Sequence, residues 1–203
     1  MAVIKDVYAA WIKVAQAAEN FNQDGYEWVC DFVMSEKQMK DFKKKYPAKK
    51  NSFKEILNNE FEKKFKMDAP FPDQEEQCVI KLKQATKKAN GEPNKQPKVY
   101  LNTGAVKDGK PVLEDITQTS QMVGNGSKVA VSVSEFTPKS GPAQGKMTCF
   151  LSGIRVDDLV EYVQDDELGF VDKSSQSDEE EEQEELADTP EEPEFDTDDQ
   201  DEY

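Results

Sequence analysis

The stretch that decides the fold is GNGSKVAVSVSEF, residues 124–136. Valines occupy every second position from Val129 to Val133 and alternate with small or polar residues. This period of two predicts a β-strand with one buried face. Gly124 and Gly126 come just before it and predict a tight bend that starts the strand. The glycine spacing and the Lys-Ser/Thr ending of a phosphate-binding loop are missing, so the stretch predicts structure and not nucleotide binding.

Other segments share this alternating pattern of β-branched and aromatic residues. In the segment around Lys81, Ile80 and Leu82 are expected on one face and the lysines on the other. The Asp-Gly pair at 108–109 predicts a hairpin turn. Gly153 predicts a bulge or bend inside the last long strand. The predicted strands are residues 6–21, 25–34, 77–85, 97–104, 126–136 and 145–163.

Two segments near the middle of the chain have a helical pattern. The first begins with Ser35 and carries Gln38 at the spacing of a capping box. The second repeats this spacing with Ser52 and Glu55. Together they predict a helical insertion at about residues 35–66 in a mainly β protein, a small closed or partly open barrel. The apolar face of the second predicted helix consists of Phe53, Ile56, Leu57, Phe61 and Phe65.

Charge is distributed unevenly along the chain. Residues 1–163 carry 25 basic and 22 acidic side chains, whereas residues 164–203 carry one lysine and 20 acids. The acidic segment has few core-forming residues, so it is expected to be disordered. Such an asymmetry is typical of an acidic interaction tail attached to a body that contacts polyanions. We therefore predict one domain at residues 1–163 and a disordered acidic tail at residues 164–203.

The composition excludes several classes of function. The chain contains no histidine, which excludes Ser-His and Cys-His nucleophiles and histidine zinc sites. Cys30, Cys78 and Cys149 lie far apart in apolar runs and predict buried thiols in a reducing compartment. No apolar run approaches the roughly 20 residues that cross a bilayer. We expect no enzyme, no metal, no cofactor and no membrane partner.

Lysines alternate with aromatic or aliphatic residues on the predicted strands. Cations that contact phosphates and rings that stack on bases are what single-stranded nucleic acid binding requires, at about 1–3 kcal/mol per stacked base. Any single ring can also be a core residue, and whether Trp11 or Trp28 faces the ligand stays open. The residues predicted to bind nucleic acid are Tyr8, Trp11, Lys13, Lys81, Lys83, Lys98, Tyr100, Lys128, Phe136, Lys146 and Phe150.

The order of these segments resembles a known family. The pieces that carry the resemblance are GYEWVCDFVM (25–34), the helical insertion that ends before DAPFPD (68–73), VIKLK (79–83), KVYLNTGAVKDGKPV (98–112), VGNGSKVAVSVSEF (123–136), KMTCFLSGIRVDDLVEY (146–162) and the acidic tail that ends in Tyr203. The chain resembles the acidic-tailed, OB-fold single-stranded DNA-binding proteins of tailed bacteriophages, of the T-odd coliphage type.

The resemblance implies a five-stranded OB-fold barrel that binds single-stranded DNA without sequence preference. It implies roles in phage DNA replication, recombination and repair, through strand protection and annealing. It also implies a homodimer in the cytoplasm of the infected host cell. The tail would occupy the DNA groove when DNA is absent and would contact the replicative DNA polymerase and the helicase-primase. The residues that this implies for partner binding are Phe195, Asp201, Glu202 and Tyr203, where the best-known member of the family ends in Phe.

Two other classes of function stay open. An acidic-tailed protein-binding module or chaperone predicts that the body without its tail does not bind DNA. A metal-dependent nuclease predicts cleavage that requires Mg²⁺. The carboxylates of Asp157 and Asp158 are adjacent in the sequence, so on a strand they would point to opposite faces and would make a poor metal site.

Overall fold

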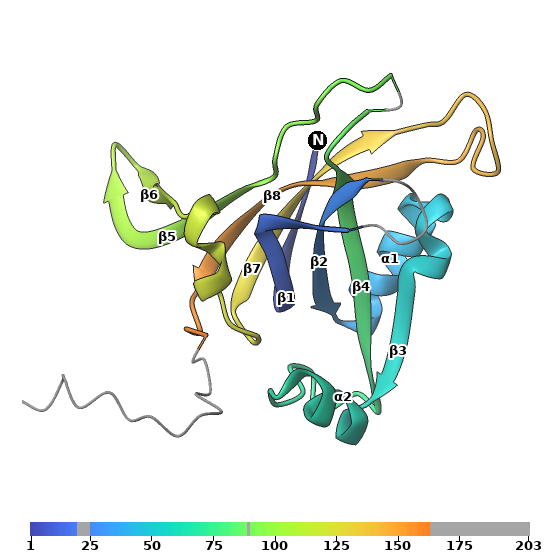
Figure 1. Ribbon diagram of the computed structural model, residues 1–203. Coiled ribbons are helices and arrows are strands. Elements are labelled where there is room, and N and C mark those ends of the chain that lie inside the picture. The colour runs from blue at the N-terminus through green and yellow to red at the C-terminus, as the bar shows by residue number, and fades with distance from the viewer. Residues whose placement is uncertain (20–24, 89, 163–203) are drawn as a thin grey trace, which may run out of the picture. The chain divides into compact units, whose positions relative to one another are not determined.

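The computed structural model describes residues 1–19, 25–88 and 90–162. The predicted acidic tail and its four partner-binding residues lie outside the described residues. The described chain is mainly β, as predicted (Figure 1). Its strands are β1 (Ala2–Glu19), β2 (Tyr26–Met34), β3 (Phe53–Leu57), β4 (Glu76–Ala85), β5 (Lys98–Lys107), β6 (Lys110–Asp115), β7 (Lys128–Phe136) and β8 (Thr148–Asp158). Its helices are α1 (Glu36–Lys45) and α2 (Asn58–Phe65), with 3₁₀ turns η1 (Pro47–Ser52) and η2 (Thr117–Met122).

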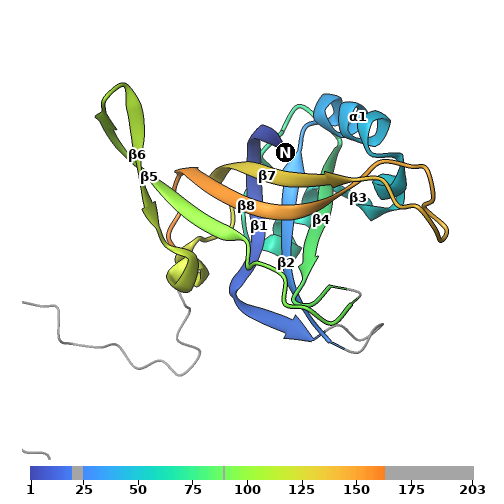
Figure 2. The ribbon, with the colours of Figure 1, turned by 90° about the horizontal axis from the view of Figure 1, so that it is seen from above.

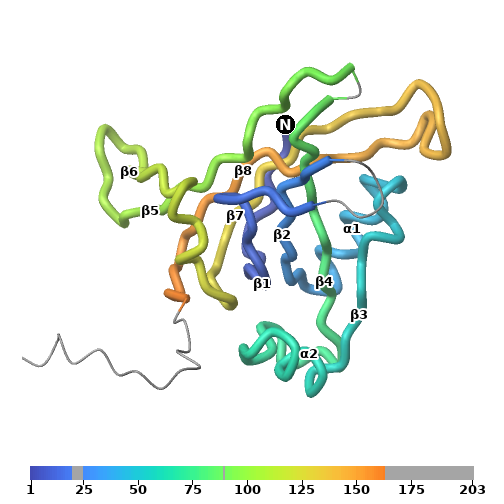
Figure 3. The backbone as a smooth tube through the Cα atoms, viewed as in Figure 1, coloured from blue at the N-terminus to red at the C-terminus, as the bar shows by residue number. Residues whose placement is uncertain are grey.

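All of these strands belong to one sheet, in the order β3-β4-β2-β1-β7-β8-β5-β6. Neighbouring strands are antiparallel except β5 and β8, which are parallel. In this order β4 lies near one edge of the sheet and β5 near the other. The chain crosses from β4 to β5 between these edges and then runs beside β8 in the same direction (Figure 3). β4 also contacts β8 directly. This connectivity is that of the OB fold, a partly open five-stranded barrel, with β1, β2, β4, β7 and β8 as the barrel strands.

The core lies on the faces that the alternation predicted. On β7, Val129, Val131 and Val133 are fully buried. On β4, Ile80 and Leu82 are fully buried, whereas the lysine between them is exposed. The two sets face each other across the barrel as parts of one apolar cluster. The predicted buried faces of both strands are therefore confirmed.

The predicted bulge at Gly153 is also confirmed, and it explains how β5 joins the sheet. The register between β7 and β8 shifts between Ser132 and Val133, next to the pair of Ser132 with Gly153. Gly153 pairs with Lys98 of β5 as well. A Cβ atom at position 153 would lie 3.1 Å from the carbonyl oxygen of Lys98. The absence of a side chain on Gly153 therefore allows the close approach of the parallel neighbour β5.

A two-residue turn joins β5 to β6, as predicted. Asp108 and Gly109 have φ angles of 52° and 72°, and positive φ at both central residues is the signature of a type I′ hairpin turn. The β5–β6 hairpin extends away from the barrel, and the connection between β7 and β8 extends from the opposite end (Figure 2). Every residue of β6 is exposed.

The helical insertion differs from the prediction in its second half. The capping box of α1 is present, with the Ser35 side chain accepting from the Gln38 backbone and the Gln38 side chain accepting from the Ser35 backbone. The prediction of a helix from Ser52 is wrong, because Phe53–Leu57 form β3 against the edge of β4. Pairing satisfies the backbone groups of that edge, and this tertiary gain outweighs local helix preference. Only Asn58–Phe65 is helical.

The three cysteines are free and buried, as predicted. Burial raises the pKa of Cys149 to about 11, and it raises the pKa of Cys30 and of Cys78 as well. Thiols in this state react slowly, because the thiolate is the nucleophile. Within the described ranges, no helix is long and apolar enough to cross a bilayer. The same ranges contain no cluster of three His, Cys, Asp or Glu residues that could hold a metal ion.

The two faces of β4 give a test of the fold. We expect Ile80→Ala to lower the free energy of unfolding by about 2–5 kcal/mol, because it removes buried methyl and methylene groups from the barrel core. Lys81→Ala on the opposite face should lower it by less than Ile80→Ala does, because the Lys81 side chain is exposed and only its charge acts on Asp31. Urea denaturation measures both. Equal losses in the two variants would contradict the assignment of Ile80 to the core face and Lys81 to the outer face of β4.

Candidate nucleic-acid interface

A groove of about 450 Å³ lies on the outer face of β1, β2 and β4, between η1, β3 and α2. Two rows of cross-strand neighbours form its floor. Trp11 of β1 pairs with Asp31 of β2, which pairs with Lys81 of β4. We call this hollow the basic groove, because its lining includes the five lysines Lys49, Lys54, Lys64, Lys81 and Lys83. The next row along the strands is Lys13, Val29 and Lys83, of which Lys83 lines the groove and Lys13 lies beside it.

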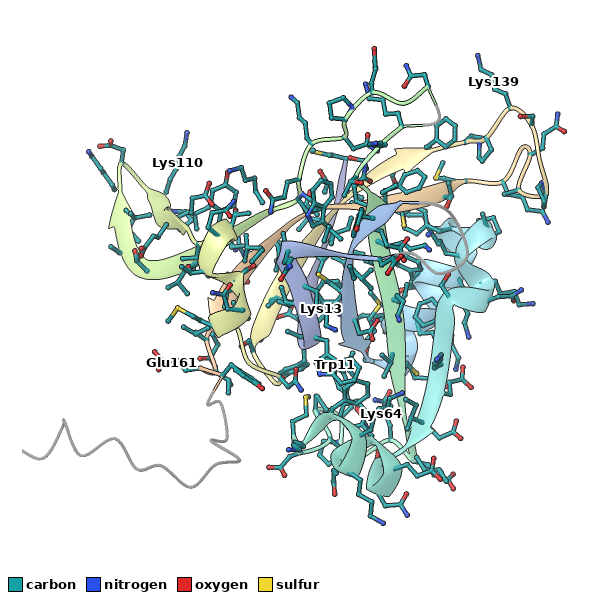
Figure 4. The ribbon with its side chains drawn as sticks, viewed as in Figure 1. Trp11, Lys13, Lys64, Lys110, Lys139 and Glu161 are labelled. Carbon is teal, nitrogen blue, oxygen red and sulfur yellow. The ribbon has the colours of Figure 1, made fainter. Side chains whose placement is uncertain are left out.

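Helix α2 forms the apolar wall at one end of the basic groove. Phe61 and Phe65 are buried against Ala10, Val33 and Val79, on the same outer face of the sheet. This second cluster fixes α2 in place and leaves the rest of the face open. Lys64 of α2, Trp11 and Lys13 lie on this side of the sheet (Figure 4).

The indole of Trp11 is partly exposed to solvent at the base of this wall. One side of the indole contacts Phe65, with ring centroids 5.4 Å apart and planes at 65°. The Nζ of Lys13 lies 5.9 Å from the indole centroid. The residue is nevertheless 44% exposed. Trp28 lies on the other face of β2. It is two positions from Cys30 and four from Phe32, so it shares the face that these residues turn toward the barrel core. Of the two tryptophans, the structure therefore places Trp11 in the groove.

A second pair of rings lies next to Lys49. Its ammonium nitrogen is 5.6 Å from the ring centroid of Phe150, and the rings of Phe150 and Phe136 are 6.3 Å apart. Phe136 is the last residue of β7 and Phe150 is the third residue of β8, so both rings lie near the base of the β7–β8 loop. They are 50% and 37% exposed, respectively. In OB folds, the face of the second and third barrel strands and the loop between the last two form the oligonucleotide site. The basic groove and this pair of rings occupy those places.

The structure brings some of the predicted site residues together and separates others. Trp11, Lys81 and Lys83 line the basic groove, and Lys13 is beside it. Phe136 and Phe150 are linked to it through Lys49. The remaining predicted residues lie elsewhere: Lys98 and Tyr100 line a separate hollow over β5, β7 and β8, Lys128 forms an ion pair of 2.9 Å with Asp6, Tyr8 packs edge-on against Phe71, and Lys146 is exposed in the β7–β8 loop.

Sequence reasoning missed several residues of the basic groove. Lys54 was assigned to a helix, whereas the alternation in FKEIL places Lys54 and Ile56 on one face of a strand. That period of two was the signal that could have found it. Lys64 of α2 and Asp31 of β2 carry no such signal, because their positions in the groove depend on how distant segments pack.

Burial and neighbouring charges change the acid–base properties of the lining. Desolvation raises the pKa of the Asp31 carboxyl, while the charges of nearby lysines, first Lys81 and then Lys64, oppose that effect. Desolvation is also the main cause that lowers the pKa of Lys49. One lysine of the lining has an acidic partner on the neighbouring strand: Lys83 forms an ion pair of 2.9 Å with Glu27. The groove thus combines cations, an exposed ring and one buried acid.

The lysines of the two hollows should titrate differently. Lys49 should lose its proton at a lower pH than Lys98, because burial penalises the charged form of Lys49. A hydrogen bond and an ion pair of 2.9 Å with Asp115 raise the pKa of Lys98. Reductive methylation with ¹³C-formaldehyde and an NMR titration would measure both pKa values. The reverse order would contradict the packing of η1 over the groove.

Among known proteins, similarity to this chain is found with solved structures. No protein-family model and no curated protein sequence matches this chain. Because sequence identity to solved structures is also low, the function proposed below depends on the groove itself. The chain is similar to the single-stranded DNA-binding protein from bacteriophage Enc34 in complex with ssDNA, at 11% identity and a TM-score of 0.43, over 77% of this chain and 85% of that chain. It is also similar to gp2.5, a single-stranded DNA-binding protein encoded by bacteriophage T7, at 12% identity and a TM-score of 0.40, over 81% of this chain and 93% of that chain.

Proposed function

We propose that this protein binds single-stranded DNA in the basic groove. The observation that carries the proposal is the exposed indole of Trp11 on a sheet face lined by five lysines. Lysines neutralise phosphates wherever the backbone passes, and an exposed ring stacks on any base, so this combination binds single strands of many sequences. Phe150 and Phe136 supply a second stacking position at the β7–β8 loop, beside Lys49.

The sequence resemblance supports finer proposals about the biological role. We propose strand protection and annealing in phage DNA replication, recombination and repair, in the cytoplasm of the host cell. The protein would act without catalysis and as a homodimer. The acidic tail would recruit the replicative DNA polymerase and the helicase-primase through Phe195, Asp201, Glu202 and Tyr203.

The charge of the tail also supports a competition with DNA. Residues 164–203 carry 20 acids and one lysine. A tether gives such a segment a high effective concentration at any cationic groove of the same chain. DNA would then have to displace the tail before it binds. Salt weakens both contacts, since both are electrostatic.

Intrinsic fluorescence tests the assignment of Trp11. The chain has two tryptophans, so titration with an unstructured oligo-dT should quench wild type and Trp28→Phe but not Trp11→Phe. Trp11→Ala should weaken binding by about 1–3 kcal/mol, the cost of one lost base stack. Fluorescence anisotropy of labelled DNA measures that loss independently of tryptophan emission. Quenching that persists in Trp11→Phe and disappears in Trp28→Phe would contradict the assignment.

Deletion of residues 164–203 tests the competition. We expect the chain that ends at Val163 to bind oligo-dT more tightly than the full chain at low salt, and the difference to shrink as salt rises. Anisotropy titrations over a range of salt concentrations would measure this. Equal affinity of the two chains at low salt would contradict it. Binding by neither chain would favour the protein-binding module instead.

A further inference from the structure

Asp31 is the one acid among the described residues that line the basic groove. It occupies the middle of the floor, with Trp11 as its neighbour on β1 and Lys81 as its neighbour on β4. Its exposed fraction is 9%, and its Oδ1 has no hydrogen-bond partner in the described part of the chain. A buried carboxylate oxygen without a partner is uncommon and costs free energy, so this group needs an explanation.

A groove that only collected phosphates would bind them better without this acid. A carboxylate repels a phosphate, and the repulsion is strongest where water is excluded. The lysines around Asp31 reduce this repulsion without removing the requirement for a hydrogen-bond donor. The phosphates of a bound strand should therefore pass the lysines at the sides of the groove. The position beside Asp31 suits a base, whose edge carries N–H donors.

The cross-strand pairing of Trp11 with Asp31 places such a donor within reach. Directly opposite residues on neighbouring strands have Cβ atoms roughly 4.5–5.5 Å apart. A base that stacks on the indole of Trp11 can therefore turn its edge toward β2, where Asp31 lies. Guanine presents two adjacent donors, N1–H and the N2 amino group, which match the two oxygens of a carboxylate once rotation about χ2 turns the buried Oδ1 of Asp31 toward the groove. Thymine presents one donor, N3–H, between two carbonyl oxygens that a carboxylate repels.

We propose that Asp31 accepts hydrogen bonds from the Watson–Crick edge of the base that stacks on Trp11, and that it favours guanine over thymine at this position. The inference rests on the proposed function, since it requires single-stranded DNA in the basic groove. Stacking remains tolerant of sequence elsewhere along the strand, so Asp31 adds one selective position to a binding mode that accepts every base.

The test compares three oligonucleotides of equal length on the full chain by competition anisotropy: oligo-dT, alternating dT and dG, and alternating dT and deoxyinosine. Alternation offers a purine to Trp11 in every second register and avoids runs of guanine. Inosine keeps N1–H and lacks the N2 amino group. We expect the guanine strand to bind about tenfold more tightly than oligo-dT, as one bidentate pair provides. The inosine strand should bind with intermediate affinity.

Variants assign the preference to the carboxylate. Asp31→Asn should bring the affinities for the guanine strand and oligo-dT close to each other, while oligo-dT binds more tightly because the repulsive charge is gone. Asp41→Asn, on the exposed side of α1, removes the same charge outside the groove lining and should keep the preference. Thermal denaturation should show that Asp31→Asn is folded. If Asp31→Asn does not fold, the comparison of the three strands on the wild-type chain still tests the preference for guanine.

Each outcome separates this inference from the proposed function. Binding of all three strands with equal affinity would overturn the role of Asp31 and leave single-stranded DNA binding in place. A guanine preference that survives in Asp31→Asn would overturn it as well. Uniformly tighter binding by Asp31→Asn, with an unchanged ratio, would show that the carboxylate acts only as a charge. No binding of any strand by the wild-type chain would overturn the proposed function itself.

Discussion

Strand β1 is paired along both of its edges, and this double pairing joins the two halves of the sheet. This strand pairs with β7 from Ala2 to Tyr8 and with β2 from Tyr8 to Glu19. A strand that serves both halves of the sheet must bend, and its pairing with β7 is interrupted between Ile4 and Val7, where Asp6 has a φ of 55°. The bend adds twist and lets one sheet curl around a single core.

The same alternation that builds the core also produces the groove. Along β1, Ile12 and Val14 face the barrel interior while Trp11 and Lys13 face outward. Because side chains on a strand alternate between faces, a row of outward residues on three adjacent strands becomes a continuous surface. The barrel strands therefore form the floor of the groove, and η1, β3 and α2 form its walls. Helix α2 covers only one end of this surface, through Phe61 and Phe65.

Local sequence signals predicted several elements correctly. The valines of β7, the capping box of α1 and the Asp108–Gly109 turn each depend on residues within one element or one turn, so their physical cause can be read from adjacent positions. The bulge at Gly153 was predicted for the same reason. The candidate site was only partly predictable: Trp11, Lys81 and Lys83 follow from the alternation of their own strands.

Contacts between distant segments determined the pairing of β3 and the assembly of the basic groove. Phe53–Leu57 fits both a helical pattern and a period of two, and it pairs as β3 because the edge of β4 offers hydrogen-bond partners that a helix in isolation would not use. The basic groove is likewise assembled from η1, β3, α2 and three barrel strands, so Lys49 and Lys64 meet Trp11 only after the chain has folded. The strand faces, the turn and the first helix depend on neighbouring residues, so they can be read from the sequence. The set of lysines around Trp11 and the burial of Asp31 among them depend on packing between distant segments, so they appear only in the folded chain.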